Sequence, residues 1–384
     1  MSSGTIMHSA GAPNSIRTQP AEQIGIMEAH DLPEVLTLYR RLWLQEKACS
    51  MPALEAYFSR LFFHHPWPDS SIRSLVCRDG EGHVIGCLGI MPRRMVLGGQ
   101  AVRVAVSHNF MVDPRRRASM AAVELMKAFF AGPQDLSLAE GNAMSRKLWE
   151  GLGGTTALLH NLRWVRPLRP AGFLLHSMTA QGLPTWLRTV GEPFCAVADA
   201  VVHRTGWGPF SYSPGLGRSE ELQDETFVEL GNRWAESRWV WPHYDLSSFT
   251  WLIDMLRRKR GLGTLRKMLV RGPQDQILGS YLYFAKPQGT SEVLHVLAKP
   301  SSIGPVLDHL FHDAWTQGSY GISGQLEPRW MSELTLRQCV FLHSGSWMLI
   351  HSQRPGIVEA IHQGKAFLSR LDGEWWIGLH QGTL

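Results

Sequence analysis

The chain has 384 residues, of which 44% are hydrophobic and 18% charged, and its formal net charge is +5. This composition argues against a disordered chain, and the length suffices for two domains of ordinary size. The basic residues are scattered instead of forming one tract, which argues against nucleic-acid binding. No apolar run approaches the roughly 18 residues of a membrane-spanning helix, so no membrane span is predicted.

Two further features concern the compartment and metals. Residues 1–21 predict a disordered N-terminal lead without the apolar segment of a signal peptide. The five cysteines form no CxxC pair, which favours reduced thiols in a core. His64-His65 has no third ligand at a usable spacing. We therefore expect a cytoplasmic protein without a metal site.

Hydrophobic periodicity predicts an alternation of strands and helices in the first half of the chain. Gly98-Gly99 marks a hairpin turn between two long strands. The predicted order is a strand at 23–29, helices at 32–42 and 52–63, strands at 72–78, 83–97 and 101–112, a helix to about 130, a strand at 136–139 and a helix to 154.

The stretch 167–215 is rich in proline and predicts a packed connector. The second half then repeats the element order of the first half, and a last helix is predicted at 356–371, before the sequence DGEWWIGL. We expect a disordered lead at 1–21, a first lobe at 22–166, a connector at 167–215 and a second lobe at 216–384.

Residues 107–154 carry the most chemical information. A strand that ends at Val112 leads into Asp113-Pro114, three arginines at 115–117 and small residues, and then into a helix. The free N–H groups at a helix N-terminus bind anions, and adjacent arginines add positive charge. The pattern suits a pyrophosphate, but a solvated basic turn that caps a helix would have the same sequence.

The element order and two motifs of this segment resemble the GNAT acyltransferase superfamily over roughly residues 22–166. That family's acyl-CoA loop follows Val-x-Pro with the pattern Q/R-x-x-G-x-G/A. Here Val112-Asp113-Pro114 matches, and RRRASMAA aligns as Arg116-x-x-Ser119-x-Ala121 or as Arg115-x-x-Ala118-x-Met120. The resemblance implies an α/β (α+β) fold with a mixed, twisted sheet that has helices on both faces.

A second motif of that family, Asn-x-x-Ala-x-x-x-Tyr, aligns with Asn142, Ser145 and Trp149. The resemblance implies that backbone groups of Met111 and Val112 pair with pantetheine and polarise the thioester carbonyl. Trp149 stands where the family places a proton-donating tyrosine, and an indole cannot donate in that way. The residues implied to contact acetyl-CoA or another acyl-CoA are Met111, Val112, Arg115, Arg116, Arg117, Ala118, Ser119, Met120, Ala121, Asn142, Ser145 and Trp149.

Direct attack of an amine on the thioester requires a base, and the strand before the arginines offers His108, whose ordinary pKa is near neutrality. Asn109 follows it, and strand alternation turns the two side chains to opposite faces. A packed strand histidine is the alternative reading of His108. Glu140 is a second candidate base, and Ser145 completes the candidate catalytic residues.

The second lobe has no arginine turn: residues 299–305 read KPSSIGP, so we expect no CoA there. Two GNAT-like lobes in tandem imply an N-acyltransferase that moves an acyl group, with acetyl favoured, from acyl-CoA to a small-molecule amine. One alternative is a non-catalytic acyl-CoA-binding protein. Another is an aminoacyl-tRNA-dependent transferase with paired GNAT-like lobes. The sequence leaves homodimerisation open.

Overall fold

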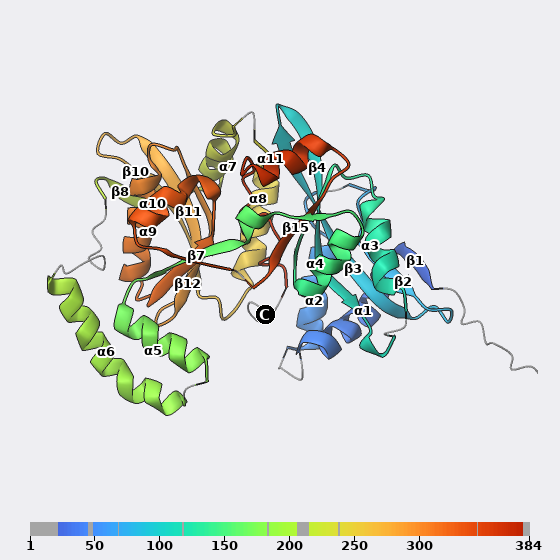
Figure 1. Cartoon of the computed structure of the whole chain (residues 1–384), viewed down its shortest axis with the longest axis horizontal. Helices are drawn as coiled ribbons and strands as arrows, with labels where there is room; N and C mark the ends of the chain where they lie inside the picture. The colour runs from blue at the N-terminus through green and yellow to red at the C-terminus, as the bar shows by residue number, and fades with distance from the viewer. Residues whose placement is uncertain are drawn as a thin grey trace, which may run out of the picture.

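The structure, a computed structural model, describes residues 22–44, 49–67, 69–116, 119–182, 184–205, 215–236, 239–343 and 345–378. Two mixed β-sheets lie side by side, each with helices packed against it (Figure 1). Within the described ranges, this arrangement confirms the expected fold class of two mixed α/β lobes in tandem.

The first sheet has the strand order β1-β2-β3-β4-β5-β15-β6, with the short β9 added beside β3. Its strands are β1 (Gln23–Ile26), β2 (Leu75–Arg78), β3 (Val84–Leu97), β4 (Gln100–Val112), β5 (Leu136–Gly141), β6 (Thr155–Thr156), β9 (Trp241–Pro242) and β15 (Trp347–His351). Its helices are α1 (Leu32–Tyr39), α2 (Met51–Phe63), α3 (Ala121–Phe130) and α4 (Ala143–Gly151).

The second sheet has the order β14-β7-β13-β12-β11-β10-β8. Its strands are β7 (Leu162–Pro167), β8 (Arg218–Glu221), β10 (Thr264–Arg271), β11 (Ile277–Ala285), β12 (Thr290–Ala298), β13 (Gly321–Gln325) and β14 (Val340–His343). The remaining helices are α5 (Pro170–Ala180), α6 (Thr185–Thr205), α7 (Asp224–Arg233), α8 (Leu246–Arg257), α9 (Ile303–Thr316), α10 (Met331–Leu336) and α11 (Pro355–His362).

The two sheets exchange one strand each. β7 follows the first sheet in the chain but pairs with β13 and β14 in the second, whereas the late strand β15 pairs with β5 and β6 in the first. The expected division at residue 166 therefore does not separate the two sheets, because it falls inside β7. The main hydrophobic core accordingly runs through both lobes.

Side-chain alternation along β4 separates the two faces of the first sheet. Val104 and Val106 belong to the cluster that includes α1 and α2, whereas Ala105 belongs to the cluster beneath α3 and α4. This alternation decides which β4 side chains can reach a cavity on the α3 face.

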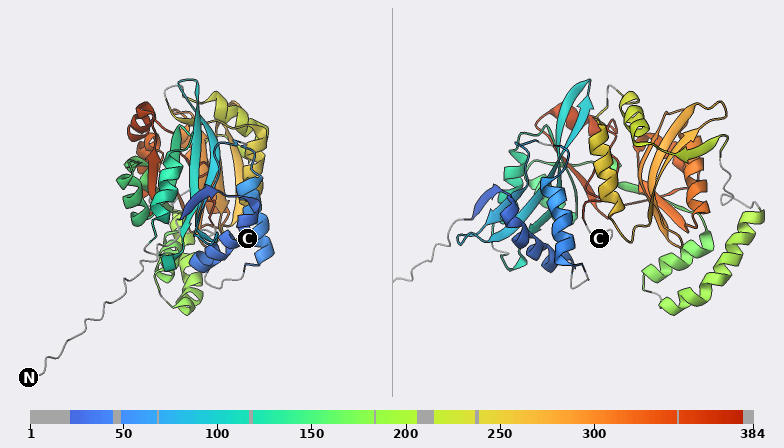
Figure 2. Two further views of the ribbon diagram at one scale, coloured as in Figure 1. Left: turned by 90° about the vertical axis from the view of Figure 1, so that its right-hand side faces the viewer. Right: turned by 180° about the vertical axis from the view of Figure 1, so that it is seen from behind.

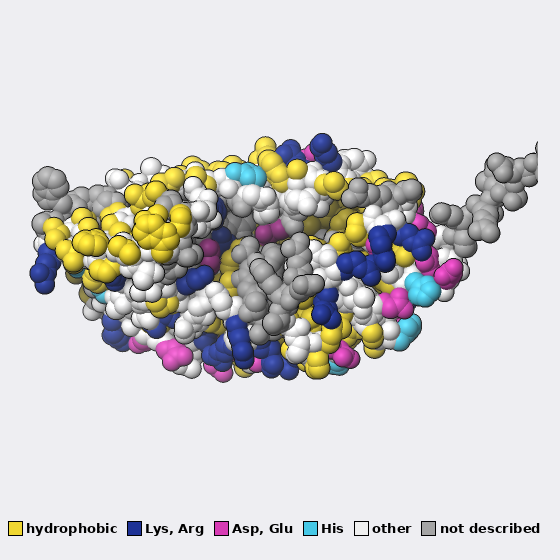
Figure 3. Space-filling view, turned by 90° about the horizontal axis from the view of Figure 1, so that it is seen from below, with side chains coloured by type: hydrophobic (Ala, Val, Ile, Leu, Met, Phe, Trp, Pro, Cys, Tyr) yellow, Lys and Arg dark blue, Asp and Glu magenta, His cyan; other side chains and the backbone are white. Residues whose placement is uncertain are grey.

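The connector expected at 167–215 contains a helical hairpin, α5 and α6, that extends below the second sheet (Figures 1 and 2). The Asp199 carboxylate accepts N–H bonds from Ala171 and Gly172, which caps α5. The outer face of the hairpin is apolar and exposed, with Phe194 74% accessible and Trp186 62% accessible, and Figure 3 shows hydrophobic side chains gathered there. None of the described helices is both long and apolar enough to cross a membrane.

The helix predicted at 356–371 ends at His362 in the structure. Gly364 has a positive φ of 71°, and the chain then continues without a regular helix to residue 378. Two side chains hold this C-terminal segment: the Tyr57 hydroxyl donates to the Ile377 carbonyl at 2.8 Å, and the Lys259 ammonium donates to the Ile377 and Gly378 carbonyls. The segment therefore occupies a fixed place between the lobes.

Candidate active site

An opening between β4 and β5 forms the centre of the candidate site. The two parallel strands pair only from Val104–Val106 to Leu136–Leu138, and beyond these residues they separate. A bulge in β4 accompanies the separation: Asn109 has a φ of 49°, and the register with β3 shifts between Cys87 and Gly89. A bulge bends its strand, so β4 turns away from β5 at this point.

Gly89 allows the bulge to pack against β3. A Cβ atom at this position would lie 2.4 Å from the His108 ring and 2.8 Å from the His108 carbonyl oxygen. Real side chains do not approach so closely, so any larger residue would push His108 and the bulge out of place.

A cavity of about 500 Å³ occupies the opening and continues toward the second lobe. Its volume lies within the range of small-molecule sites. From the first sheet and its helices come Trp43, Ser107, Asn109, Phe110, Met126, Ala139, Glu140, Gly141, Asn142, Ser145, Trp149, Met348 and Leu349; from the second lobe and the inter-lobe segments come His160, Leu162, Arg163, Glu292, Gln325, Gly345, Ser346, Arg370, Glu374 and Trp375.

Two half-buried carboxyl groups line this cavity. Glu374, from the C-terminal segment, accepts the backbone N–H of Glu140 at 3.0 Å. Burial, reinforced by the nearby Glu140 carboxylate, raises the pKa of Glu374 to about 8. Burial also raises the pKa of Glu140, against the opposing effect of Arg370, and one oxygen of Glu140 has no hydrogen-bond partner within the described structure. Glu374 therefore combines a pKa near neutrality with a place in the cavity lining.

His108 lies on the opposite face of the sheet from the cavity. It shares that face with Val104 and Val106, and its ring stacks on Phe62 of α2 with centroids 5.4 Å apart. Burial lowers the pKa of His108 to about 3. It is fully buried and does not line the cavity, so its position corresponds to the packed strand histidine. Asn109, at the bulge, lines the cavity, and its amide nitrogen lies 3.1 Å from Nδ1 of His108.

The N-terminus of α4 forms another wall of the cavity. The Asn142 side chain accepts the backbone N–H groups of Met144 and Ser145, both at 2.9 Å, and so caps the helix. Ser145 lines the cavity beside it. Trp149 is 1% exposed, and its indole N–H donates to the Ile350 carbonyl of β15 at 2.9 Å. Trp149 thus has a packing role in the wall.

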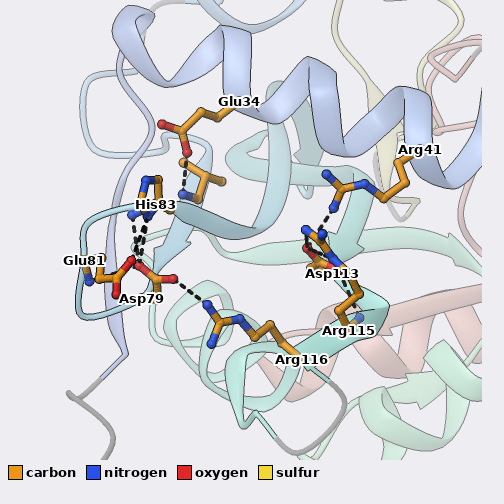
Figure 4. Close-up of polar contacts among 9 residues, drawn as sticks. Glu34, Arg41, Asp79, Glu81, His83, Asp113, Arg115 and Arg116 are labelled. Carbon is orange, nitrogen blue, oxygen red and sulfur yellow. Dashed lines mark hydrogen bonds and ion pairs between the residues drawn. The ribbon is translucent and has the colours of Figure 1, made fainter.

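The arginine turn lies outside the cavity, at the end of β4 and before α3 (Figure 4). Arg115 bonds Asp113 at 2.7 Å, Arg41 bonds the same carboxylate at 2.8 Å, and Arg116 bonds Asp79 at 2.8 Å. The Arg115 hydrogen bond holds the pKa of Asp113 at about 2. The Arg115 and Arg116 side chains are 71% and 48% exposed, whereas their partners Asp113 and Asp79 are 8% and 11% exposed, so the two guanidinium groups are accessible to an anion from solvent.

The other predicted CoA contacts differ in accessibility. Met111 and Ala121 are buried, Val112 is half-buried, and Met120 is 54% exposed at the start of α3. The Ser119 hydroxyl accepts the Ala121 N–H at 2.9 Å. Arg117 and Ala118 lie outside the described residues. The structure therefore places Asn142, Ser145 and Trp149 at the cavity and the turn at 115–121 beyond it.

The far end of the cavity belongs to the second lobe. Arg370 donates to the Glu292 carboxylate at 2.6 Å, and Ser323 donates to the same oxygen at 2.6 Å. The Arg370 guanidinium also lies 4.7 Å from the centre of the Trp375 ring. This wall of the cavity is thus polar, and hydrogen bonds and a cation–π contact connect its side chains.

Sequence reasoning missed Glu374, Arg163, Arg370 and Glu292. All four reach the cavity only because strands and the C-terminal segment cross between the lobes. The one local signal was the charged and aromatic sequence DGEWW after a predicted helix, which carries no motif.

Two mixed sheets in tandem, the first with its fourth and fifth strands separated around a cavity, have the architecture of paired GNAT-like folds. No protein-family model matches the chain, and no curated protein does. Three solved structures illustrate the similarity. A protein of unknown function from Enterococcus faecalis V583, described as a probable N-acyltransferase, shares 9% identity at a TM-score of 0.57 over 86% of this chain and 73% of that one.

A GCN5-related N-acetyltransferase from Anabaena variabilis shares 13% identity at a TM-score of 0.57, over 86% of this chain and 72% of that one. Saccharomyces cerevisiae N-myristoyltransferase with bound myristoyl-CoA shares 10% identity at a TM-score of 0.50, over 90% of this chain and 81% of that one. These likenesses confirm the resemblance to GNAT-type proteins at the level of the fold.

Proposed function

We propose that the protein is an N-acyltransferase that moves a short acyl group from acyl-CoA to a small amine. The opening between β4 and β5 supports this proposal, because it holds a cavity with a half-buried carboxyl group, and the strand β4 that borders it ends at the arginine turn. The neighbouring folds include N-acetyltransferases and an N-myristoyltransferase with bound myristoyl-CoA.

In this proposal, the pantetheine arm lies along the separated strands. Beyond Val106, β5 no longer pairs with β4, and the Glu374 carboxyl accepts backbone N–H groups of Asn109 and Glu140 in the opening. The amide groups of pantetheine would pair with the other facing backbone groups of the two strands. Met111 and Val112 are the proposed contacts near the thioester. Arg115 and Arg116 would bind the pyrophosphate by exchanging their present carboxylate partners.

Glu374 is the proposed general base. Its carboxylate takes a proton from the acceptor ammonium, and the free amine attacks the thioester carbonyl carbon. Collapse of the tetrahedral intermediate breaks the C–S bond, and the thiolate takes the second amine proton to give CoA and the amide. A pKa of about 8 suits a base that works near neutral pH. The CoA thiol is acidic enough to leave without a dedicated acid, so Trp149 need not supply one.

The cavity volume favours a short acyl group such as acetyl. About 500 Å³ must hold the thioester end and the acceptor together. The cysteines in the described chain are free, which is compatible with the proposed cytoplasmic location.

Calorimetric titration with acetyl-CoA, followed by measurement of CoA release across an amine panel, tests the proposal. We expect binding, and release that depends on an amine. The Arg115→Ala/Arg116→Ala variant should bind more weakly, while Arg257→Ala, which removes an exposed arginine of α8, should bind normally. No binding by the wild-type protein would refute the proposal. Binding without release would identify the non-catalytic alternative.

A further inference from the structure

Arg163 is a charged side chain without a protein partner at the far end of the cavity. It is the second residue of β7, is half-buried and lines the cavity. Its Nε atom is buried without a hydrogen bond, and no carboxylate bonds it within the described structure. Arg78 and Arg370, in comparison, are paired with Asp31 and Glu292. A buried guanidinium N–H without an acceptor is costly, and the half-buried Arg163 borders the cavity, so a ligand anion there could supply the missing acceptor.

The register of the second sheet places Arg163 beside Gln325. The two residues are Cα partners across β7 and β13, so their side chains lie on the same face, and both line the cavity. The Gln325 amide group donates to the His160 carbonyl at 3.2 Å, which fixes its orientation. Arg163 can thus present its guanidinium beside a fixed polar neighbour.

The carboxyl groups that can accept a hydrogen bond or a proton from an ammonium group lie elsewhere in the same cavity. Glu374 and Glu140 are its carboxyl groups without a cationic side chain bonded to them, whereas Glu292 is bonded to Arg370. Once this last pair is set aside, the described lining has two acids at the base of the strand opening and one arginine toward the second lobe. This distribution complements a ligand with an ammonium group and an anionic group.

We propose that the acceptor is an aminocarboxylate, whose ammonium group binds at Glu374 and Glu140 and whose carboxylate binds Arg163. This inference rests on the proposed function and specifies its substrate class. Arginine matches a carboxylate because its planar fork can form two parallel hydrogen bonds with the two oxygens. Arg163 would act in binding and orientation, apart from the proton transfer at Glu374.

The test compares aminocarboxylates with their carboxylate-free counterparts. Glycine and methylamine, β-alanine and ethylamine, and phenylalanine and phenethylamine form matched pairs. For the wild-type protein with acetyl-CoA, we expect kcat/KM for CoA release to be at least tenfold higher with the better aminocarboxylate than with its partner. Arg163→Gln should lower kcat/KM for the aminocarboxylate about 100-fold, mainly through KM, and leave the carboxylate-free amine nearly unchanged. Arg257→Gln is the matched control.

Thermal-shift measurements with the same pairs provide a readout that does not require turnover. Aminocarboxylates should raise the Tm of the wild-type protein and not that of Arg163→Gln, which must itself unfold cooperatively. Equal use of both members of each pair, or equal losses for both in Arg163→Gln, would overturn this inference and leave the proposed function intact. If no pair member shifts the Tm or is acylated, the inference is also wrong. Failure to bind acetyl-CoA would instead refute the proposed function.

Discussion

Replacing Glu374 with glutamine should change how stability depends on pH. The Glu374 carboxyl contacts the Glu140 backbone N–H and lies within the field of the Glu140 carboxylate, and its pKa rises from 4.5 to about 8. The ionisable groups that affect the pKa of Glu140 or are affected by its charge are Arg370 and Glu374. The folded protein therefore keeps a proton on Glu374 between about pH 4.5 and pH 8, where the unfolded chain has lost it.

The sign follows from proton linkage. Because the folded state binds more protons in this window, the free energy of unfolding falls as the pH rises from about 4.5 to about 8. At about 1.4 kcal/mol per pKa unit, the full effect is roughly 5 kcal/mol. Water in the open cavity will solvate the ionised carboxylate, so we expect roughly half of this value. Glu374→Gln cannot ionise and should lose this part of the pH dependence.

Urea unfolding at pH 5, 7 and 9 measures the effect. The free energy of unfolding of Glu374→Gln, relative to that of the wild type, should increase by roughly 2–3 kcal/mol between pH 5 and pH 9. Glu359→Gln, which changes an exposed carboxyl of α11, should show no such gain. Glu374→Gln should also lower the rate of amine acylation about 100-fold and keep its affinity for acyl-CoA. A constant stability difference between Glu374→Gln and wild type at all three pH values would refute the reasoning.

Three further predictions follow from the geometry around β4 and α4. The Arg115→Ala/Arg116→Ala variant should raise KM for acyl-CoA about tenfold with little change in kcat, and an unchanged KM would remove the turn from the binding site. Gly89→Ala should lower the free energy of urea unfolding by about 2–3 kcal/mol because its Cβ would collide with His108, and a loss below about 0.5 kcal/mol would contradict the close approach. Trp149→Phe should cost about 1–2 kcal/mol through its lost hydrogen bond to a β15 carbonyl and keep kcat within a few-fold, whereas a 100-fold loss of kcat would indicate a role in proton transfer.

The sequence predicted the elements that depend on local pattern. The apolar periodicity of α2 and the hairpin of β3 and β4 were evident from the sequence. Simple alternation along β4 does not hold at His108 and Asn109, because the bulge brings their side chains within 3.1 Å of each other, and only Asn109 lines the cavity. The sequence does not indicate which face of the sheet holds the cavity, because this depends on where α3 packs. The helix expected to Leu371 was wrong beyond His362, since the turn at Gly364 follows from tertiary contacts.

The site was harder to predict than the fold. Asn142 and Ser145 were found because they belong to a local motif at a helix N-terminus. Glu374 was missed because the C-terminal segment brings it to the cavity from more than 200 residues beyond Glu140. Arg163 was missed because the pairing of β7 in the second sheet brings it there from about 20 residues beyond Glu140. The hydrophobic periodicity of a single helix or strand does not predict contacts between segments so far apart in the sequence.

The exchange of β7 and β15 has a consequence for biosynthesis. During translation, β5 and β6 emerge from the ribosome long before residues 347–351, which lie between them in the finished sheet. A nascent chain that ends near residue 340 therefore carries open strand edges, which invite pairing with other chains. The first sheet can therefore be completed only after residues 347–351 have been synthesised, and a premature stop codon before residue 347 would leave β5 and β6 without the strand that joins them.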